Sequence, residues 1–356
     1  MKILYAYRYG IIGGVYSQLA LRRDALQSAG FQCELFFSQD NNLGQVLKER
    51  DGIHFGAEVS FRRLVQKGRF DIIIVIDSPE LLSVAAGPLY RRNTVYLDVH
   101  TTTSTGLAYL IDINPVKLAG ITVPTNYSAK LVTKRLGKNT PNIQVLPNIL
   151  QGSLFAPDQK LRLKAGLKIK QYAAIEFVWV GKLDHHKNWR LALVYTAMLQ
   201  DQLGNVRLSM VGGNTASTSQ STAFFELAYR LGISERVSWI DRIDNFKLVE
   251  IYRQCAATGG AMLVTSRDES FGMAASEALL CGCPLITNDL PVFREIYPDS
   301  SLISRVDIWN PNQVVEAATT LLKQQERDEV INLHCYLAEK YSPEAFINSF
   351  KGLIAV

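Results

Sequence analysis

The sequence predicts an α/β protein made of two domains, each a parallel sheet wound by helices. The chain has 356 residues, which exceeds one average domain and suffices for two hydrophobic cores. Short runs of β-branched and aromatic residues alternate with stretches of helical period, as in parallel sheets with helical crossovers. Several runs are apolar throughout, which is typical of strands that helices cover on both faces.

Twelve candidate strands follow one another along the chain. Six lie in the first half, at residues 2–7, 33–37, 71–77, 94–99, 120–125 and 143–148. Six more lie in the second half, at residues 175–181, 206–212, 237–241, 260–266, 284–289 and 301–304. Residues 147–159 break this rhythm with prolines, a glycine and polar residues, so we expect a linker there. The predicted domains are residues 1–150 and 151–341.

The last stretch of the chain carries the signature of a helix start. Ser342 suits the cap, Pro343 suits the first helical position, and Glu344 places an acidic group in the first turn. We expect a final helix at about 342–356.

Composition favours a soluble cytoplasmic protein. The chain is 47% hydrophobic and 20% charged, and no apolar run reaches the roughly 18 residues that a membrane-spanning helix needs. The N-terminus resembles a strand and not a secretion signal. We expect the five cysteines to be reduced core thiols. The close pair Cys281 and Cys283 lacks a second cysteine pair nearby, so we expect no metal there.

The net charge of +5 belongs to the first half. Residues 1–150 hold 17 Lys and Arg against 11 Asp and Glu, a surplus of +6, while the remainder holds 21 against 22. The densest basic stretches are residues 60–70 and 89–93. They are either a solvated face or an attraction for an anionic surface or substrate. Nucleic-acid binding is disfavoured because the surplus is modest and no recognisable module accompanies it.

Glycines and polar residues follow the predicted strands at the edge where parallel sheets bind ligands. Two such edges that face one another would form an interdomain cleft. The residues are Gly13, Gly14 and His100 in the first half, and Gly181, Lys182, Gly212, Gly213, Arg242 and Glu269 in the second.

The segment TSRDESFGMAASEALL places two carboxylates around an expected helix start near Gly272. The first N–H groups of that helix, from residues 271–274, would bind a phosphate. Glu269 lies just outside the helix and can accept hydrogen bonds from hydroxyls beside the phosphate. Glu277 lies about one and a half turns into the helix and leans back toward a second set of hydroxyls. A nucleotide-sugar, with hydroxyls on both sides of a diphosphate, fits this pattern best.

A diphosphate needs countercharge, and the chain contains no Asp-x-Asp motif of the kind that holds a metal. The stretch VGKLDHHKN instead places Lys182 and Lys187 near one strand end. These lysines can neutralise the diphosphate without a metal ion, although solvent exposure alone would also explain them.

Together, ESFGMAASEALLCGCPLI, VGKLDHHKN, Gly13-Gly14 and VLPNILQGSLFAP resemble the retaining glycosyltransferase family 4, the glycosyl transferases group 1. The resemblance covers nearly the whole chain. It implies the GT-B fold, in which two Rossmann-like domains face a cleft. The N-terminal domain would receive the acceptor, the C-terminal domain would bind the nucleotide-sugar, and the last helix would pack back on the N-terminal domain.

The resemblance also implies a role for each matching residue. Glu269 would contact hydroxyls of the transferred sugar, and Glu277 would hold the ribose. Lys182 and Lys187 would bind the diphosphate. The other donor-binding residues that we expect are Gly13, Gly14, Gly181, Gly212, Gly213, Arg242, Ile243, Ser270, Phe271, Gly272, Met273 and Ala274.

Two positions depart from the family pattern. Lys182 stands where Arg is usual, which loses bidentate geometry but keeps the charge. Asp241 stands where Gly is common, which bears on the base contacts expected of Arg242 and Ile243. By default His100 is a loop residue without a role, but the resemblance places it near the acceptor and the transferred sugar. We count it with Glu269, Lys182 and Lys187 as catalytic, and assign no chemistry to His185 and His186.

The prediction is a metal-independent hexosyltransferase that needs no cofactor. It would move glucose or a similar hexose from a UDP-sugar, with retention, to a saccharide or lipid-linked saccharide in polysaccharide or glycolipid assembly. By resemblance, the acceptor attacks from the face that the diphosphate leaves, and a leaving phosphate oxygen takes its proton. A peripheral contact of the basic domain with the inner face of the membrane is part of this hypothesis. The alternatives are a GT-B sugar-nucleotide epimerase and a non-catalytic nucleotide-sugar-binding protein.

Overall fold

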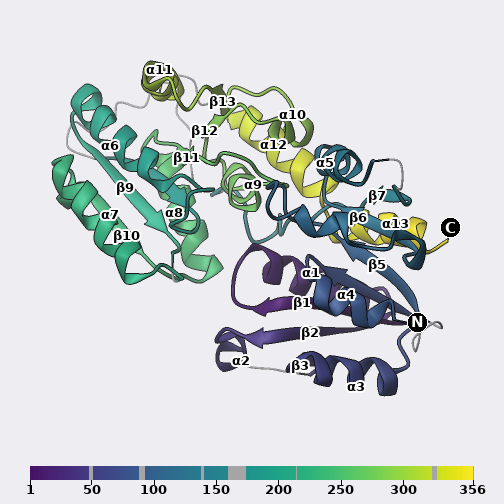
Figure 1. Ribbon diagram of the computed structural model, residues 1–356. Coiled ribbons are helices and arrows are strands. Elements are labelled where there is room, and N and C mark those ends of the chain that lie inside the picture. The colour runs from purple at the N-terminus through teal and green to yellow at the C-terminus, as the bar shows by residue number, and fades with distance from the viewer. Residues whose placement is uncertain are drawn as a thin grey trace. The chain divides into compact units, whose positions relative to one another are not determined.

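The computed structural model describes residues 1–47, 51–87, 93–137, 140–158, 174–213, 215–322 and 327–355. The chain divides into two compact units (Figure 1). The first consists of Met1–Ile149 together with Tyr341–Val356, and the second of Leu150–Lys340. Every helix within the described ranges is too short or too polar to cross a lipid bilayer.

The first unit holds a seven-stranded sheet in the order β3-β2-β1-β4-β5-β6-β7, and all its strand pairs are parallel. The strands are β1 (Lys2–Gly10), β2 (Gln32–Asp40), β3 (Ile53–Phe55), β4 (Ile72–Ile76), β5 (Thr94–Asp98), β6 (Gly120–Val123) and β7 (Ile143–Val145). The helices are α1 (Gly14–Ser28), α2 (Leu43–Val46), α3 (Glu58–Gly68), α4 (Pro79–Ala85), η2 (Ala108–Ile111), η3 (Pro115–Lys117), α5 (Asn126–Leu136) and α13 (Pro343–Ile354).

Alternating residues of the strands feed two separate cores in this unit, as the two-residue period of a strand requires. Leu4 and Ala6 of β1 point to the side covered by α3, α4 and α5. Ile3 and Tyr5 point to the side covered by α1 and α13. Both faces of the sheet are therefore buried, which explains the continuously apolar strands.

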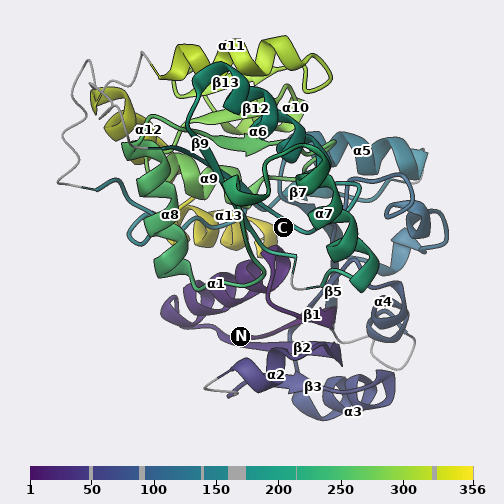
Figure 2. The same cartoon turned by 90° about the vertical axis from the view of Figure 1, so that its left-hand side faces the viewer.

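The final helix belongs to the first unit although it follows the second in sequence. The Ser342 hydroxyl accepts the Ala345 N–H at 3.1 Å, and Pro343 is the first residue of α13, as the sequence predicted. Phe346 and Phe350 enter the core beneath β1, and Figure 2 shows α13 beside α1.

The second unit holds a six-stranded sheet in the order β10-β9-β8-β11-β12-β13, again with parallel pairs throughout. The strands are β8 (Ile175–Val180), β9 (Val206–Val211), β10 (Val237–Ile240), β11 (Met262–Val264), β12 (Leu285–Asn288) and β13 (Ile303–Val306). The helices are α6 (Trp189–Leu203), α7 (Thr218–Arg230), η5 (Ser234–Arg236), α8 (Asn245–Ala257), α9 (Met273–Leu280), α10 (Pro291–Ile296), α11 (Pro311–Leu321) and α12 (Arg327–Lys340).

The predicted fold class, two parallel α/β sheets, is confirmed, and each of the twelve predicted strands overlaps an observed one. The prediction missed β3, a three-residue edge strand in the sequence GIHFG, because so short a run between glycines carries no periodic signal. The expected linker is irregular over residues 147–158, and residue 159 lies outside the described residues.

The expectation that all five cysteines are core thiols was wrong for one of them. Every cysteine is free, but Cys335 is exposed whereas Cys33, Cys255, Cys281 and Cys283 are buried. Cys335 lies on α12, where one side of the helix meets solvent.

Candidate active site

The strand order of the second sheet switches direction beside β8. From β8 the chain moves through β9 and β10 to one edge, and it then returns to place β11 on the other side of β8. At such a switch point the loops after two neighbouring strands diverge and leave room for a ligand. Here these loops are residues 181–188 after β8 and 265–272 after β11.

Hydrogen bonds join these two loops. The Arg267 N–H donates to the His186 carbonyl at 2.9 Å. The indole N–H of Trp179, at the end of β8, donates to the Thr265 hydroxyl at 3.0 Å, and that hydroxyl donates to the Lys187 carbonyl at 2.9 Å. The backbone at Lys187 is therefore fixed against the loop that carries Glu269.

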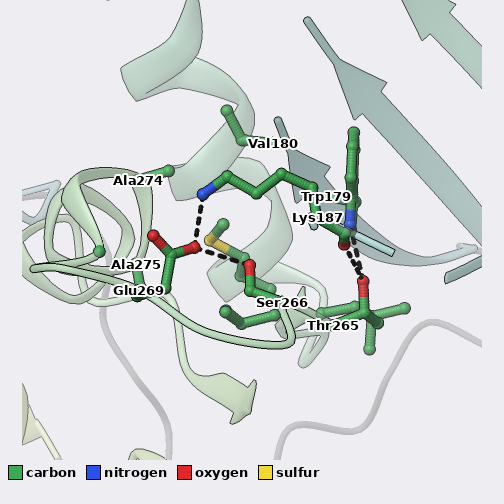
Figure 3. A pocket seen from close by; sticks show the side chains of 12 residues that line it. Trp179, Val180, Lys187, Thr265, Ser266, Glu269, Ala274 and Ala275 are labelled. Atoms are coloured by element: carbon green, nitrogen blue, oxygen red, sulfur yellow. Dashed lines mark hydrogen bonds and ion pairs between the residues drawn. The ribbon is translucent and has the colours of Figure 1, made fainter. Parts of the chain in front are cut away.

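Glu269 and Lys187 form an ion pair at the centre of the switch point. The Lys187 amine contacts Oε1 of Glu269, and the Ser266 hydroxyl donates to the same oxygen at 2.6 Å (Figure 3). Only 8% of Glu269 is exposed. Burial raises the pKa of this carboxyl, but Lys187 and Ser266 outweigh burial and hold the pKa below its usual range. Glu269 is therefore an anion at neutral pH and can accept hydrogen bonds from hydroxyls.

A small pocket opens beside this ion pair. It is lined by Lys187 and Glu269 together with residues from the start of α9, among them Gly272 and Ala274 (Figure 3). The first turn of an α-helix carries N–H groups that the helix does not use, and it favours negative charge. The pocket thus combines an ammonium, a carboxylate and a helix N-terminus.

Gly272 is the N-cap of α9, as the sequence analysis expected. Its φ of 86° lies in the left-handed region. A Cβ at this position would also lie 2.5 Å from an atom of the Phe293 ring. Both the backbone conformation and the packing therefore require glycine where the loop turns into the helix.

Glu277 lies in the same helix in a different electrostatic environment. Its carboxyl has no hydrogen-bond or ion-pair partner within the described part of the chain, and burial raises its pKa to about 8. The Tyr252 hydroxyl, which is close to Glu277, donates instead to the Ala274 carbonyl at 3.2 Å. Glu277 is thus mainly protonated at neutral pH until a donor or a cation reaches it.

The glycines at the ends of β8 and β9 allow close packing of loops. A Cβ on Gly212, whose φ is 106°, would lie 2.4 Å from the Gly181 carbonyl oxygen. A Cβ on Gly213, whose φ is 88°, would lie 3.0 Å from Leu183. These contacts account for Gly212 and Gly213 through packing alone. Lys182, next to Gly181, is exposed at the same loop.

Arg242 and Ile243 lie farther from the ion pair. Their loop follows β10, the edge strand that β9 separates from β8. Arg242 is exposed and Ile243 is half-buried. None of the contacts within the described residues joins this loop to Lys187 or Glu269, so their predicted role in base binding stays a prediction.

The three remaining candidates belong to the first unit. Gly13 and Gly14 stand at the start of α1, and a Cβ on either would meet nothing within 4 Å, so packing in this unit does not require glycine there. His100 follows β5, and its ring nitrogen Nε2 lies 2.9 Å from Oδ2 of Asp98.

Sequence reasoning missed four residues that lie close to the predicted ones. Ser266 shares Glu269 with Lys187, and Tyr252 lies beside Glu277. Asp77 and Asp98 both bind His100. The two aspartates could have been found, because each ends or follows a predicted strand. Ser266 and Tyr252 carry no comparable local signal.

Residues 169–333 match the model of the family described as glycosyl transferases group 1. This part of the chain is similar to that family, so the resemblance noted in the sequence is confirmed. The matched residues include both loops of the switch point, Glu277, and the loop with Arg242 and Ile243.

Proteins with a similar sequence are D-inositol 3-phosphate glycosyltransferases. The one from Segniliparus rotundus is 25% identical over 203 residues, which are 57% of this chain and 44% of that protein. The one from Mycobacteroides abscessus is 36% identical over 136 residues, which are 37% of this chain and 28% of that protein. This chain thus matches less than half the length of these curated relatives.

Solved structures share the fold over the entire chain. Anabaena HepE in complex with UDP and glucose has a TM-score of 0.82 at 15% identity and covers 100% of this chain and 99% of its own. Sucrose-phosphate synthase from Thermosynechococcus elongatus has a TM-score of 0.74 at 15% identity and covers 100% of this chain and 98% of its own. This chain therefore has the GT-B fold that the sequence predicted.

Proposed function

We propose that this chain is a glycosyltransferase that moves a hexose, best glucose or a similar sugar, from a UDP-sugar to an acceptor hydroxyl with retention at the anomeric carbon. The observation that carries the proposal is the buried, ionised Glu269 paired with Lys187 at the switch point, beside the N-terminus of α9. The family of the domain supports the same reaction class.

The charges of the site suit a nucleoside diphosphate. Lys187 lines the pocket and Lys182 lies exposed on the same loop, so both can approach a diphosphate there. The start of α9 adds its N–H groups. The similar HepE structures contain UDP, UDP with glucose, and UDP-glucose, which supports uridine and glucose as the donor.

The proposed reaction breaks the bond between the anomeric carbon and the diphosphate oxygen and forms a bond to the acceptor oxygen on the same face. The acceptor proton goes to the leaving diphosphate. The lysines and the start of α9 stabilise the charge that develops on that group. Glu269 accepts hydrogen bonds from hydroxyls of the transferred sugar and holds it in place. We assign the donor to the second unit, and the acceptor, a saccharide or lipid-linked saccharide, to the first.

A panel of nucleotide-sugars tests the proposal. We expect UDP-glucose or another UDP-hexose to raise the melting temperature most, and to be consumed only slowly without an acceptor. Conversion of the sugar-nucleotide to an isomer without acceptor would support an epimerase instead. Stabilisation without turnover toward any acceptor would support a binding protein, and no stabilisation by any member would overturn the proposal.

Metal independence is a separate prediction. Because lysine ammonium groups supply the countercharge in the proposed site, activity should persist within about twofold after chelation with EDTA. Replacing Lys187 with Met should lower kcat about 10²-fold or more. Added Mg²⁺ should not restore that loss. Loss of wild-type activity in EDTA with recovery in Mg²⁺ or Mn²⁺ would contradict the assignment.

A further inference from the structure

The ring of His100 is held by a buried carboxylate in the first unit. His100 lies two residues beyond the end of β5, and its side chain is 9% exposed. Its Nε2 lies 2.9 Å from Oδ2 of Asp98, which is fully buried. The other ring nitrogen, Nδ1, has no hydrogen-bond partner among the described residues.

Asp98 is itself fixed by two side chains, Arg22 of α1 and Thr122 of β6. Its Oδ2 accepts a hydrogen bond from Nη1 of Arg22 at 2.6 Å, and its Oδ1 accepts one from the Thr122 hydroxyl at 2.8 Å. Arg22 is also buried, and its Nη2 donates to the Leu146 carbonyl and to Oδ1 of Asn148, each at 3.2 Å. Asp98 therefore cannot rotate away from His100 without breaking a charged contact.

The ionisation of Asp98 decides which nitrogen of His100 carries the proton. Burial raises the pKa of this carboxyl, but His100 and Arg22 outweigh burial and hold the pKa well below its usual range. A carboxylate can only accept a hydrogen bond. Nε2 of His100 therefore carries a hydrogen, and in the neutral form of the ring Nδ1 is an acceptor.

A second carboxylate fixes the backbone of His100. Asp77, at the end of β4, has a φ of 37°. Its Oδ2 accepts the N–H groups of His100 at 2.9 Å and of Thr101 at 3.0 Å, and its Oδ1 accepts the Tyr109 hydroxyl at 3.0 Å. Two carboxylates from neighbouring strands thus determine the place of one imidazole.

Stability alone does not account for this arrangement. A buried ion pair costs desolvation that apolar packing of the same volume would avoid, so it is a poor means of stabilising a core. β4, which directly precedes Asp77, lies beside β1, where the order of the first sheet also switches direction, and β5, which ends at Asp98, lies on the other side of β4. Ligand sites in α/β sheets occur at the carboxyl ends of such strands.

We propose that Asp98 and Asp77 are positioning residues that hold His100 with Nε2 protonated and Nδ1 presented to the substrate as an acceptor for a sugar hydroxyl. Arg22 keeps Asp98 in place and charged. This inference rests on the proposed glycosyltransferase function for the identity of the substrate, but the geometry of the ring is independent of it.

Nitrogen-15 NMR of labelled histidines tests the geometry without any activity. The wild-type chain should show one strongly deshielded, slowly exchanging Nε2 proton that disappears in His100→Ala. Asp98→Asn replaces a charged acceptor by a neutral one, so the signal should shift upfield and exchange faster. Thr122→Val removes a hydrogen bond from Asp98 but leaves the His100 contact, and it should keep the signal. Absence of the signal from the wild type would overturn the proposal.

A double-mutant cycle then tests the positioning role. Asp98→Asn should lower kcat about tenfold or more in the wild-type background, with a smaller change in KM, and should have little further effect in His100→Ala. Asp77→Asn, a second isosteric change, should behave in the same way. Equal losses with and without His100 would show a structural role and overturn the proposal. If the wild-type chain transferred no sugar, the proposed function would be wrong. The NMR signal of the Nε2 proton would still test the geometry of His100.

Discussion

Glu269 lies in the loop before α9 and Glu277 lies within that helix, but the two carboxyl groups differ in their partners. Glu269 has a lysine and a serine as partners, whereas Glu277 is half-buried and has none within the described residues. The pKa of the first is lowered and that of the second is raised. At neutral pH Glu269 is therefore an ionised hydrogen-bond acceptor, whereas Glu277 is mainly a neutral carboxylic acid.

This difference predicts separate losses on mutation. Glu277→Ala should weaken binding of free UDP about tenfold to a hundredfold, because a ribose contact exists in donor and product alike. Glu269→Ala should leave UDP binding within about threefold but lower transfer about 10²-fold. Calorimetry with UDP and kinetics with the donor measure both. If Glu269→Ala lost UDP as severely as Glu277→Ala, the division of roles would be wrong.

The raised pKa of Glu277 predicts a pH dependence of donor binding. Its pKa of about 8 means that the carboxyl is protonated below that pH, whereas ribose hydroxyls donate best to the ionised form. Affinity for UDP-glucose should therefore rise between pH 6 and pH 8, by up to about tenfold per unit, and level off above. Glu277→Gln should remove this slope. Parallel profiles for the two proteins in calorimetry would refute the prediction.

At the scale of elements, the start of α9 positions much of the proposed donor site. Gly272 combines a left-handed backbone with a ring contact to Phe293, and the helix that it begins carries Glu277. The ion pair between Lys187 and Glu269 also depends on the loop after β8, because the Thr265 hydroxyl donates to the Lys187 carbonyl in that loop. A substitution at Gly272 would therefore disturb both folding and the pocket.

Gly272→Ala should destabilise the second unit by about 2–4 kcal/mol, because it adds backbone strain and displaces Phe293. Gly232→Ala is the matched control: its φ is 67°, but a Cβ there meets nothing within 4 Å. That variant should lose only about 1 kcal/mol, the cost of strain alone. Urea unfolding followed by tryptophan fluorescence compares them, and equal losses would show that the Phe293 contact costs nothing.

At the scale of the whole molecule, the positive net charge comes from the first half of the chain, residues 1–150. The basic side chains of residues 60–70 are exposed, on α3 and just after it, and Arg62 pairs with Glu58 at 2.8 Å. Arg91 and Arg92, the second basic pair, lie outside the described residues. The surplus of +6 in residues 1–150 motivates a contact between the first unit and an anionic membrane, which would bring a lipid-linked acceptor to the enzyme.

Liposome sedimentation tests this contact. The chain should bind anionic vesicles at low salt and release at moderate salt, since each basic residue near the surface contributes about 1 kcal/mol. Changing Arg62, Arg63, Lys67 and Arg69 to Gln should abolish binding. Changing Lys117, Lys130 and Lys134, also exposed in this unit, should weaken it less. If the chain bound neither anionic nor neutral vesicles, the membrane contact would be wrong and the acceptor would be a soluble molecule.

The sequence by itself determined the fold class and the location of the two loops that we propose bind the donor. Period and apolar character are local properties, so they revealed twelve strands, the helix start at Gly272 and the cap at Ser342. The rule that ligands bind at strand ends then selected Glu269, Lys187 and His100.

Only the tertiary structure decided what these residues do to one another. Lys187 meets Glu269 across 82 positions of sequence, and Arg22 meets Asp98 across 76. The pKa of each carboxyl depends on such neighbours and on burial, which the order of residues does not contain. Glu269 and Glu277 look alike in the chain, but the fold gives a cation to Glu269 and burial without a partner among the described residues to Glu277.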